Sequence, residues 1–123
     1  MTRFRSVILI ILAVAWPLVA CDAYMKLDVT VRDRSGVGLK DAAVRVAIAK
    51  YGRELWREVT ADHGSVQVGS TYGFRSGPRL LTVDKDHYKT FSAAFDPRPE
   101  YTCEILLRSE AEVESSSGNC VAR

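Results

Sequence analysis

The sequence predicts an all-β fold, a seven-stranded Greek-key β-sandwich. Three observations predict it. Apolar and polar residues alternate in short runs, turn-forming residues separate the runs, and no stretch after residue 25 has the 3.6-residue period of an amphipathic helix. The seven runs lie between residues 26 and 108, which is the size of a small sandwich domain.

The first three expected strands carry the clearest alternation. Residues 26–32 place an apolar residue at every second position, and after the turn at 33–36 the second run does the same from Val44 to Ile48. A strand with one apolar face packs that face against a second sheet. In the third run, residues 55–60, Leu55 and Val59 share one face and Trp56 the other, so either face could be the buried one.

The other four expected strands are bounded by turn residues. Residues 65–68 follow a turn at 62–64, and a glycine- and serine-rich loop covers 69–78. The last three strands are expected at 79–83, 88–95 and 102–108. Pro97 and Pro99 end the sixth strand, because proline cannot donate to a β-ladder.

The composition changes after residue 108. Residues 109–119 are rich in glutamate and serine and contain few apolar side chains. Such a segment buries too little apolar surface to offset the entropy of ordering it. We therefore expect residues 109–123 to form a flexible acidic tail, which a bridge at Cys120 would tie back to the domain.

Three segments resemble a carboxypeptidase regulatory-like domain: VRDRSGVGLKDAAVRV (31–46), VTADHGSVQV (59–68) and LTVDKDHY (81–88). That family has the transthyretin-like, or prealbumin-like, sandwich, so the resemblance implies this fold for residues 26–108. The family pattern has glycine where this chain has Asp41 and His87, and an aromatic residue in place of Val66. Such domains are usually accessory or binding modules, which implies a non-catalytic role.

The N-terminal segment predicts where in the cell the protein is located. Arg3 and Arg5 precede the apolar residues 7–16, and the following Leu18-Val19-Ala20-Cys21 resembles the lipobox of bacterial lipoprotein precursors. The resemblance implies a signal peptide at 1–20 and acylation of Cys21, followed by a lipidated linker at 21–25. The mature protein would then be anchored in the cell envelope, facing the periplasm. Asp22 resembles the inner-membrane retention signal of enteric-type bacteria, with the outer membrane as the alternative.

Two other interpretations of the head remain open. The first is an uncleaved membrane helix. Residues 7–20 would span only about 21 Å as a helix, short of the roughly 30 Å hydrocarbon core. The second is an ordinary secretory signal cleaved at another position.

Charge limits the partners of the mature chain. Without residues 1–20, which carry Arg3 and Arg5, 15 basic residues balance 15 acidic ones. No basic excess remains to bind nucleic acid. We expect the partners to be the membrane, through the lipid anchor, and an envelope protein or glycan.

The cysteines suggest a disulfide. If Cys21 is acylated, Cys103 and Cys120 remain as a candidate pair in an oxidising compartment. A bridge over so short a loop contributes about 3 kcal/mol in the chain-entropy model. Cys103 also shares an apolar face with Ile105 and Leu107, so a buried free thiol is the alternative.

Residues suited to catalysis or metal binding are few. The two histidines, His63 and His87, both lie in expected turns, close to Asp62, Asp84 and Asp86. Aspartate favours turns without any metal, because its side chain bonds to nearby backbone amides. A catalytic nucleophile also needs an oriented base. The near-consecutive Asp62, His63 and Ser65 lie in one tight turn, which cannot direct three side chains at one centre. We therefore expect the protein to have no enzymatic activity, no metal site and no cofactor. The alternative is an envelope enzyme or a metal-handling protein that uses these residues.

The loop at residues 69–78 is the candidate partner-binding site. It combines glycines with Tyr72, Phe74 and Arg75, and these residue types are common in binding hot spots. The alternative is that the two aromatic side chains fold back and cap the sandwich.

Overall fold

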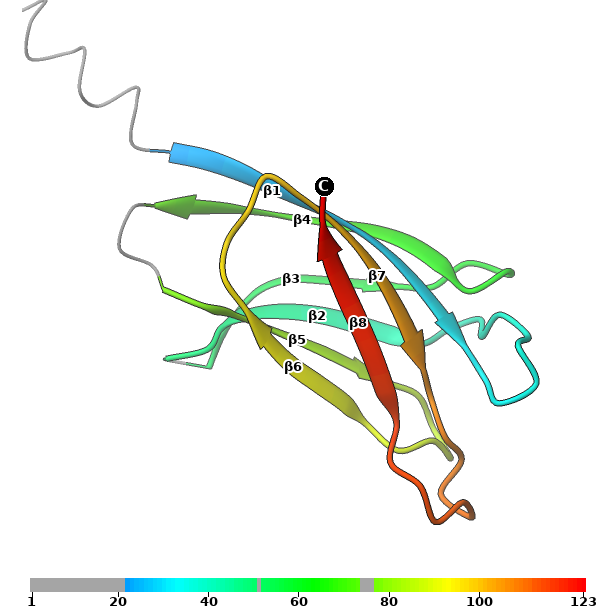
Figure 1. The fold of residues 1–123 in the computed structure, drawn as a ribbon. Coiled ribbons are helices and arrows are strands. Elements are labelled where there is room, and N and C mark those ends of the chain that lie inside the picture. Colours follow the sequence, from blue (N-terminus) through cyan, green and yellow to red (C-terminus); the bar gives the residue numbers. More distant parts are fainter. Residues whose placement is uncertain (1–21, 51, 74–76) are drawn as a thin grey trace, which may run out of the picture.

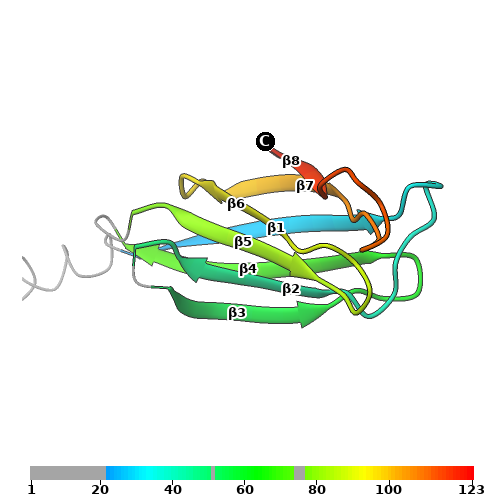
Figure 2. The ribbon, with the colours of Figure 1, turned by 90° about the horizontal axis from the view of Figure 1, so that it is seen from below.

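The computed structural model describes residues 22–50, 52–73 and 77–123, which form two four-stranded sheets packed face to face (Figures 1 and 2). The all-β sandwich prediction is confirmed, with eight strands in these residues instead of seven. The strands are β1 (Asp22–Arg32), β2 (Ala43–Ile48), β3 (Arg53–Val59), β4 (Ser65–Gly73), β5 (Arg79–Asp84), β6 (Phe91–Phe95), β7 (Glu100–Leu106) and β8 (Ser117–Ala122).

The two sheets divide the strands evenly. Sheet A has the order β4-β1-β7-β8 and sheet B the order β3-β2-β5-β6. All neighbouring strands are antiparallel except β1 and β7, which run parallel. Strand β1 is therefore paired on both sides, and its apolar face lies at the centre of the sandwich.

The core forms between the inner faces of the two sheets. Alternate residues of β1, from Met25 to Val31, are at most 1% exposed. They face apolar residues of sheet B such as Val44 and Leu81, which are fully buried. Burying one such side chain contributes roughly 1.5–3 kcal/mol. Within the described residues, one continuous core of buried apolar side chains joins the two sheets.

Sheet A is longer at its N-terminal side than the sequence predicts. Residues 22–25, expected to be a linker, are the beginning of β1 and pair with residues 70–73 of β4. Met25 is fully buried, because it continues the apolar alternation of the strand by one more step. The expected loop at 69–78 is correspondingly shorter, since β4 continues to Gly73.

The expected flexible tail is wrong. Residues 117–122 form β8, which pairs antiparallel with β7 along the edge of sheet A. Gly118 makes a close approach possible: a Cβ atom there would lie 2.5 Å from Cδ1 of Ile105 and 2.9 Å from Cζ of Phe91. The backbone ladder to β7 supplies the stabilisation that the side-chain composition does not.

The segment between β7 and β8 is held by polar contacts to Lys89. The Lys89 Nζ donates hydrogen bonds to the backbone oxygens of Glu112 and Glu114. The Ser116 hydroxyl donates to the Lys89 oxygen at 2.6 Å and accepts from the Arg108 amide at 2.9 Å. An acidic, serine-rich composition therefore does not prevent order in this segment.

Cys103 and Cys120 are joined by a disulfide in the structure, with their Cα atoms 4.0 Å apart. The two residues are directly opposite each other on β7 and β8. Cys103 is also fully buried. Burial of Cys103 and a disulfide are therefore compatible, because β8 brings the second sulfur to the edge of the core; the alternative of a free thiol differs from this structure.

One strand boundary differs from the expectation, and the open question about the faces of the third strand is answered. The sixth strand begins at Phe91, while Tyr88 forms only an isolated bridge with Ser109. On β3, Trp56 pairs with the buried Val46, and cross-strand partners share a face. Trp56 therefore lies on the core side, but β3 is an edge strand and leaves 41% of this residue exposed.

The loops gather at two opposite ends of the sandwich (Figure 2). The end where β1 begins, called here the N-terminal end, also carries the connections β2–β3, β4–β5 and β6–β7. The opposite end, called the far end, carries the connections β1–β2, β3–β4, β5–β6 and β7–β8. The described part of the chain has no helix with the length and hydropathy needed to cross a membrane, and the apolar residues 7–20 lie outside it.

Candidate functional site

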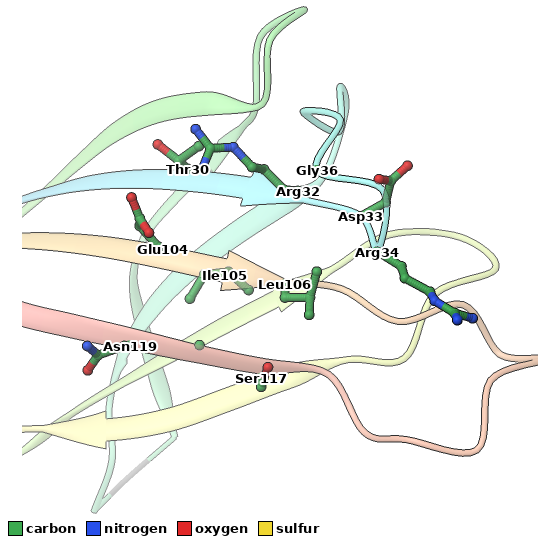
Figure 3. Close-up of a pocket in the computed structure, with 11 residues that line it drawn as sticks. Thr30, Arg32, Asp33, Arg34, Gly36, Glu104, Ile105, Leu106, Ser117 and Asn119 are labelled. Atoms are coloured by element: carbon green, nitrogen blue, oxygen red, sulfur yellow. The ribbon is translucent and has the colours of Figure 1, made fainter.

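A hollow of about 500 Å³ opens on the outer face of sheet A, toward the far end. Figure 3 shows that its lining comes from β1, β7 and β8 and from the turn that follows β1. Most of the side chains are polar or charged. The lining residues are Thr30, Arg32, Asp33, Arg34, Gly36, Glu104, Ile105, Leu106, Ser117, Gly118 and Asn119.

The strand register arranges these side chains in two rows. Thr30, Glu104 and Asn119 are cross-strand neighbours, and so are Arg32, Leu106 and Ser117. Each row points outward because the alternate residues of the same strands fill the core. The floor of the hollow is therefore a paired sheet and not a loop.

The turn after β1 forms one wall of the hollow. The Asp33 carboxylate accepts hydrogen bonds from the Ser35 hydroxyl at 2.6 Å and from the amides of Ser35 and Val37 at 2.9 and 3.1 Å. These bonds, the hydroxyl of Ser35 foremost, hold the pKa of Asp33 below its usual range. The carboxylate thus stays charged and fixes the turn that carries Arg34.

Arg34 links this hollow to a second one beside it. Its guanidinium lies 3.7 Å from Glu112, whose carboxylate is also 3.6 Å from Arg108. The second hollow, of about 480 Å³, lies between this turn and the β7–β8 segment, with Tyr88 and Leu107 in its lining. The two hollows share Asp33 and Arg34 in their linings and therefore lie side by side at the far end.

The chemistry of the first hollow suits recognition. Arg32 and Glu104 form no ion pair with any side chain that the structure describes, so both charges are open to a partner. The hydroxyls of Thr30 and Ser117 and the amide of Asn119 add hydrogen-bonding groups of both kinds. Such a surface fits a polar partner.

The structure places only part of the predicted binding loop. The backbone of Tyr72 is in β4, opposite Ala23, so this residue is not in a loop as the sequence suggested. Phe74, Arg75 and the predicted lipidation residue Cys21 lie outside the described residues.

The histidines and aspartates of the alternative function lie in or beside turns, as expected, but are not brought together. Asp62 forms an ion pair with Lys40 at 3.3 Å, and Asp84 with Arg45 at 2.6 Å. Within the described residues, no group of three or more histidine, cysteine, aspartate or glutamate side chains is arranged to hold a metal ion.

Sequence reasoning missed the hollow. Its charged residues from β1 and β7 were visible only as the polar face of two predicted strands. Ser117 and Asn119 complete the rows, and they belong to the segment that was expected to be a flexible tail. The alternation of Gly118 and Cys120 with the polar Ser117 and Asn119 was the one signal for β8, and it is weak because the residues are small and the apolar Val121 interrupts it.

No family model matches this chain, and no curated protein matches it. Several solved structures share its fold. The 5-hydroxyisourate hydrolase of Klebsiella pneumoniae is similar with a TM-score of 0.56 and 15% identity, over 79% of this chain and 99% of that one. The wild-type catechol 1,2-dioxygenase of Acinetobacter radioresistens has a TM-score of 0.54 and 16% identity, over 85% of this chain and 57% of that one.

A third similar structure is the 3-chlorocatechol 1,2-dioxygenase of Rhodococcus opacus 1CP, with a TM-score of 0.54 and 10% identity. The match covers 70% of this chain and 59% of the dioxygenase. This chain thus spans little more than half the length of the dioxygenases. At these identities the similarity shows a transthyretin-like fold, and a fold of this kind hosts many unrelated functions.

Proposed function

We propose that this chain is a lipid-anchored protein of the bacterial cell envelope, and that its transthyretin-like sandwich is a non-catalytic binding or assembly module. The observation that carries the proposal is the hollow of sheet A, where Arg32 and Glu104 are held by paired strands without ion-pair partners among the described residues. The lipobox-like Leu18-Val19-Ala20-Cys21 supports the anchor. We assign the partner to the classes expected from the sequence, an envelope protein or glycan.

The position of the hollow agrees with such a role. It lies toward the far end, while the chain enters the sandwich at the opposite end (Figure 1). A module anchored through residue 21 would therefore present the hollow away from its point of attachment. Charged and hydrogen-bonding groups on a rigid surface supply specificity for a polar partner.

Site-specific photocrosslinking tests the docking site. A photoreactive amino acid replaces Asn119 in the hollow and, in a matched control, Ser92, which is exposed on the outer face of sheet B. After illumination of intact cells, we expect a discrete crosslinked species from position 119 and none from position 92. Equal products from both positions, or none from either, would contradict the assignment of the hollow.

A second experiment reverses one charge in the hollow and measures the crosslink again. Arg32→Glu should abolish the crosslink from position 119, because the guanidinium would no longer attract the partner. Arg57→Glu, on the edge strand β3 of the other sheet, should leave the crosslink unchanged.

A further inference from the structure

We infer that the N-terminal end of the sandwich lies against a negatively charged lipid bilayer, and that Lys50, Arg53 and Arg98 bind its anionic headgroups. The inference rests on the proposed lipid anchor and extends it, because it assigns an orientation and a lipid class to the anchored protein. Two independent observations carry it.

The first observation is the absence of a spacer between the proposed anchor and the fold. Strand β1 begins at Asp22, the residue directly after Cys21, and Asp22 already pairs with Gly73 of β4. Consecutive Cα atoms are about 3.8 Å apart. An acyl group on Cys21 therefore holds the first strand within a few ångströms of the headgroups. A domain on a long flexible linker would move freely, but this one has no such freedom.

The second observation is the charge at that end. Lys50 and Arg53 lie at the β2–β3 connection and Arg98 lies at the β6–β7 connection, and all three are exposed. The acidic residues at this end are Asp96 in the β6–β7 connection and, in the adjoining strand ends, Asp22, Glu54 and Glu100. Glu54 is paired with Arg57 at 2.7 Å and Glu100 with Lys26 at 3.8 Å, so these two charges are already balanced. The loops of the far end carry more acidic than basic residues, and the exposed acids among them include Asp62, Glu110 and Glu114.

The two ends would respond oppositely to an anionic surface. A basic residue close to such a surface is attracted by about 1 kcal/mol, which corresponds to a roughly five-fold change in occupancy. The three basic residues favour contact of the N-terminal end, and the acidic loops disfavour contact of the far end. Strand β1 has 11 residues, so at about 3.3 Å per residue the far end would stand roughly 35 Å from the headgroups.

The test couples the protein to lipid chemically, so that it does not depend on acylation in cells. The mature chain (residues 21–123) is attached through the Cys21 thiol to a maleimide lipid. It contains both sheets and the core between them. The vesicles contain either phosphatidylcholine alone or phosphatidylcholine with phosphatidylglycerol. Backbone hydrogen exchange is then measured at residues 49–53 and 96–99, and at the far-end segments 33–38 and 109–114.

We expect slower exchange at residues 49–53 and 96–99 on the phosphatidylglycerol vesicles only, and no lipid dependence at the far end. The triple variant Lys50→Gln, Arg53→Gln, Arg98→Gln should lose this protection, about five-fold in occupancy for each charge removed. A matched triple variant at the far end, Arg34→Gln, Lys40→Gln, Lys85→Gln, should keep it. High salt should abolish it, since the Debye length falls to about 3 Å at 1 M.

Three results would overturn the inference: equal exchange on both lipids, protection of the far-end segments instead, or equal loss of protection in the two triple variants. None of these results concerns acylation in cells. A failure of the lipid-anchor proposal would appear separately, as the absence of a fatty acid on Cys21.

Discussion

Asp41 and His87 have positive φ angles of 61° and 71°, in the left-handed region that favours glycine. These are the two positions at which this chain replaces a glycine of the carboxypeptidase regulatory-like pattern. Aspartate and histidine tolerate this conformation better than most residues, but at a cost in free energy. Neither side chain has a hydrogen-bond partner among the described residues to offset that cost.

We therefore predict that Asp41→Gly and His87→Gly each raise the free energy of unfolding by about 0.5–1 kcal/mol. Glycine removes the free-energy cost of the left-handed conformation in the folded state. This gain should exceed the free energy lost through the extra conformational entropy that glycine adds to the unfolded chain. Denaturant melts of the purified domain provide the measurement. Asp86→Gly is the control: its φ is not positive, so only the entropic term should remain, and it should destabilise by a few tenths to about 1 kcal/mol. Destabilisation by all three variants would contradict this account.

The disulfide is the second feature at the scale of residues. Cys103 and Cys120 face each other across the β7–β8 ladder. We predict that thiol counting on unfolded, unreduced protein finds neither sulfur free, and that reduction lowers the free energy of unfolding by about 3 kcal/mol. The Cys103→Ala, Cys120→Ala double variant should show no further loss on reduction. Two free thiols in the wild-type protein would support the buried-thiol alternative instead.

The strands with a clear apolar alternation were predictable from the sequence, and those without it were not. Strands β1, β2 and β5 match the expected ranges to within a few residues, because a two-residue period determines which side chains enter the core. Strand β8 consists mostly of small and polar residues, and its one larger apolar residue, Val121, is exposed. Its stability depends on its ladder to β7, the disulfide and the contacts of Lys89. No local pattern encodes these distant partners.

The contact of Lys89 with the β7–β8 segment can be tested directly. Lys89→Met keeps the aliphatic stem but removes the donors to the oxygens of Glu112 and Glu114. We predict faster hydrogen exchange and easier proteolysis within residues 109–116, with little change in the core strands, because this segment contributes no residue to the buried core.

Lys85→Met is the matched control for this prediction. Lys85 also donates to a backbone oxygen at the far end, that of Lys40 at 2.6 Å, but not to the β7–β8 segment. It should leave exchange in residues 109–116 unchanged. If both variants behaved like the wild type, the order of this segment would come from the pairing of β8 and from the segment's other contacts, such as those of Ser116.

At the scale of the whole molecule, the candidate site is a product of the topology. The hollow needs β1, β7 and β8 side by side, and the parallel pairing of β1 with β7 joins segments about 75 residues apart in the chain. Composition and periodicity identify strands but not their neighbours. For this reason the sequence led to the fold class and to a candidate loop, whereas the outer face of sheet A became visible only in the structure.

The proposed lipid anchor would join this fold to the membrane, and it gives the last prediction. If the lipobox-like residues are recognised, cells given a clickable fatty-acid analogue should incorporate it into the wild-type protein, which should fractionate with membranes. Cys21→Ser should lose the label, because serine offers no thiol to acylate.

Cys120→Ser is the control for the loss of a cysteine as such, and should retain the label. An uncleaved signal helix would give membrane association without label. A secretory signal cleaved elsewhere would give unlabelled protein outside the membrane fraction.

Because β1 begins at Asp22, acylation of Cys21 would leave the sandwich no freedom to separate from the bilayer. A label that persisted in Cys21→Ser would refute the anchor, and with it the proposed orientation of the hollow away from the membrane.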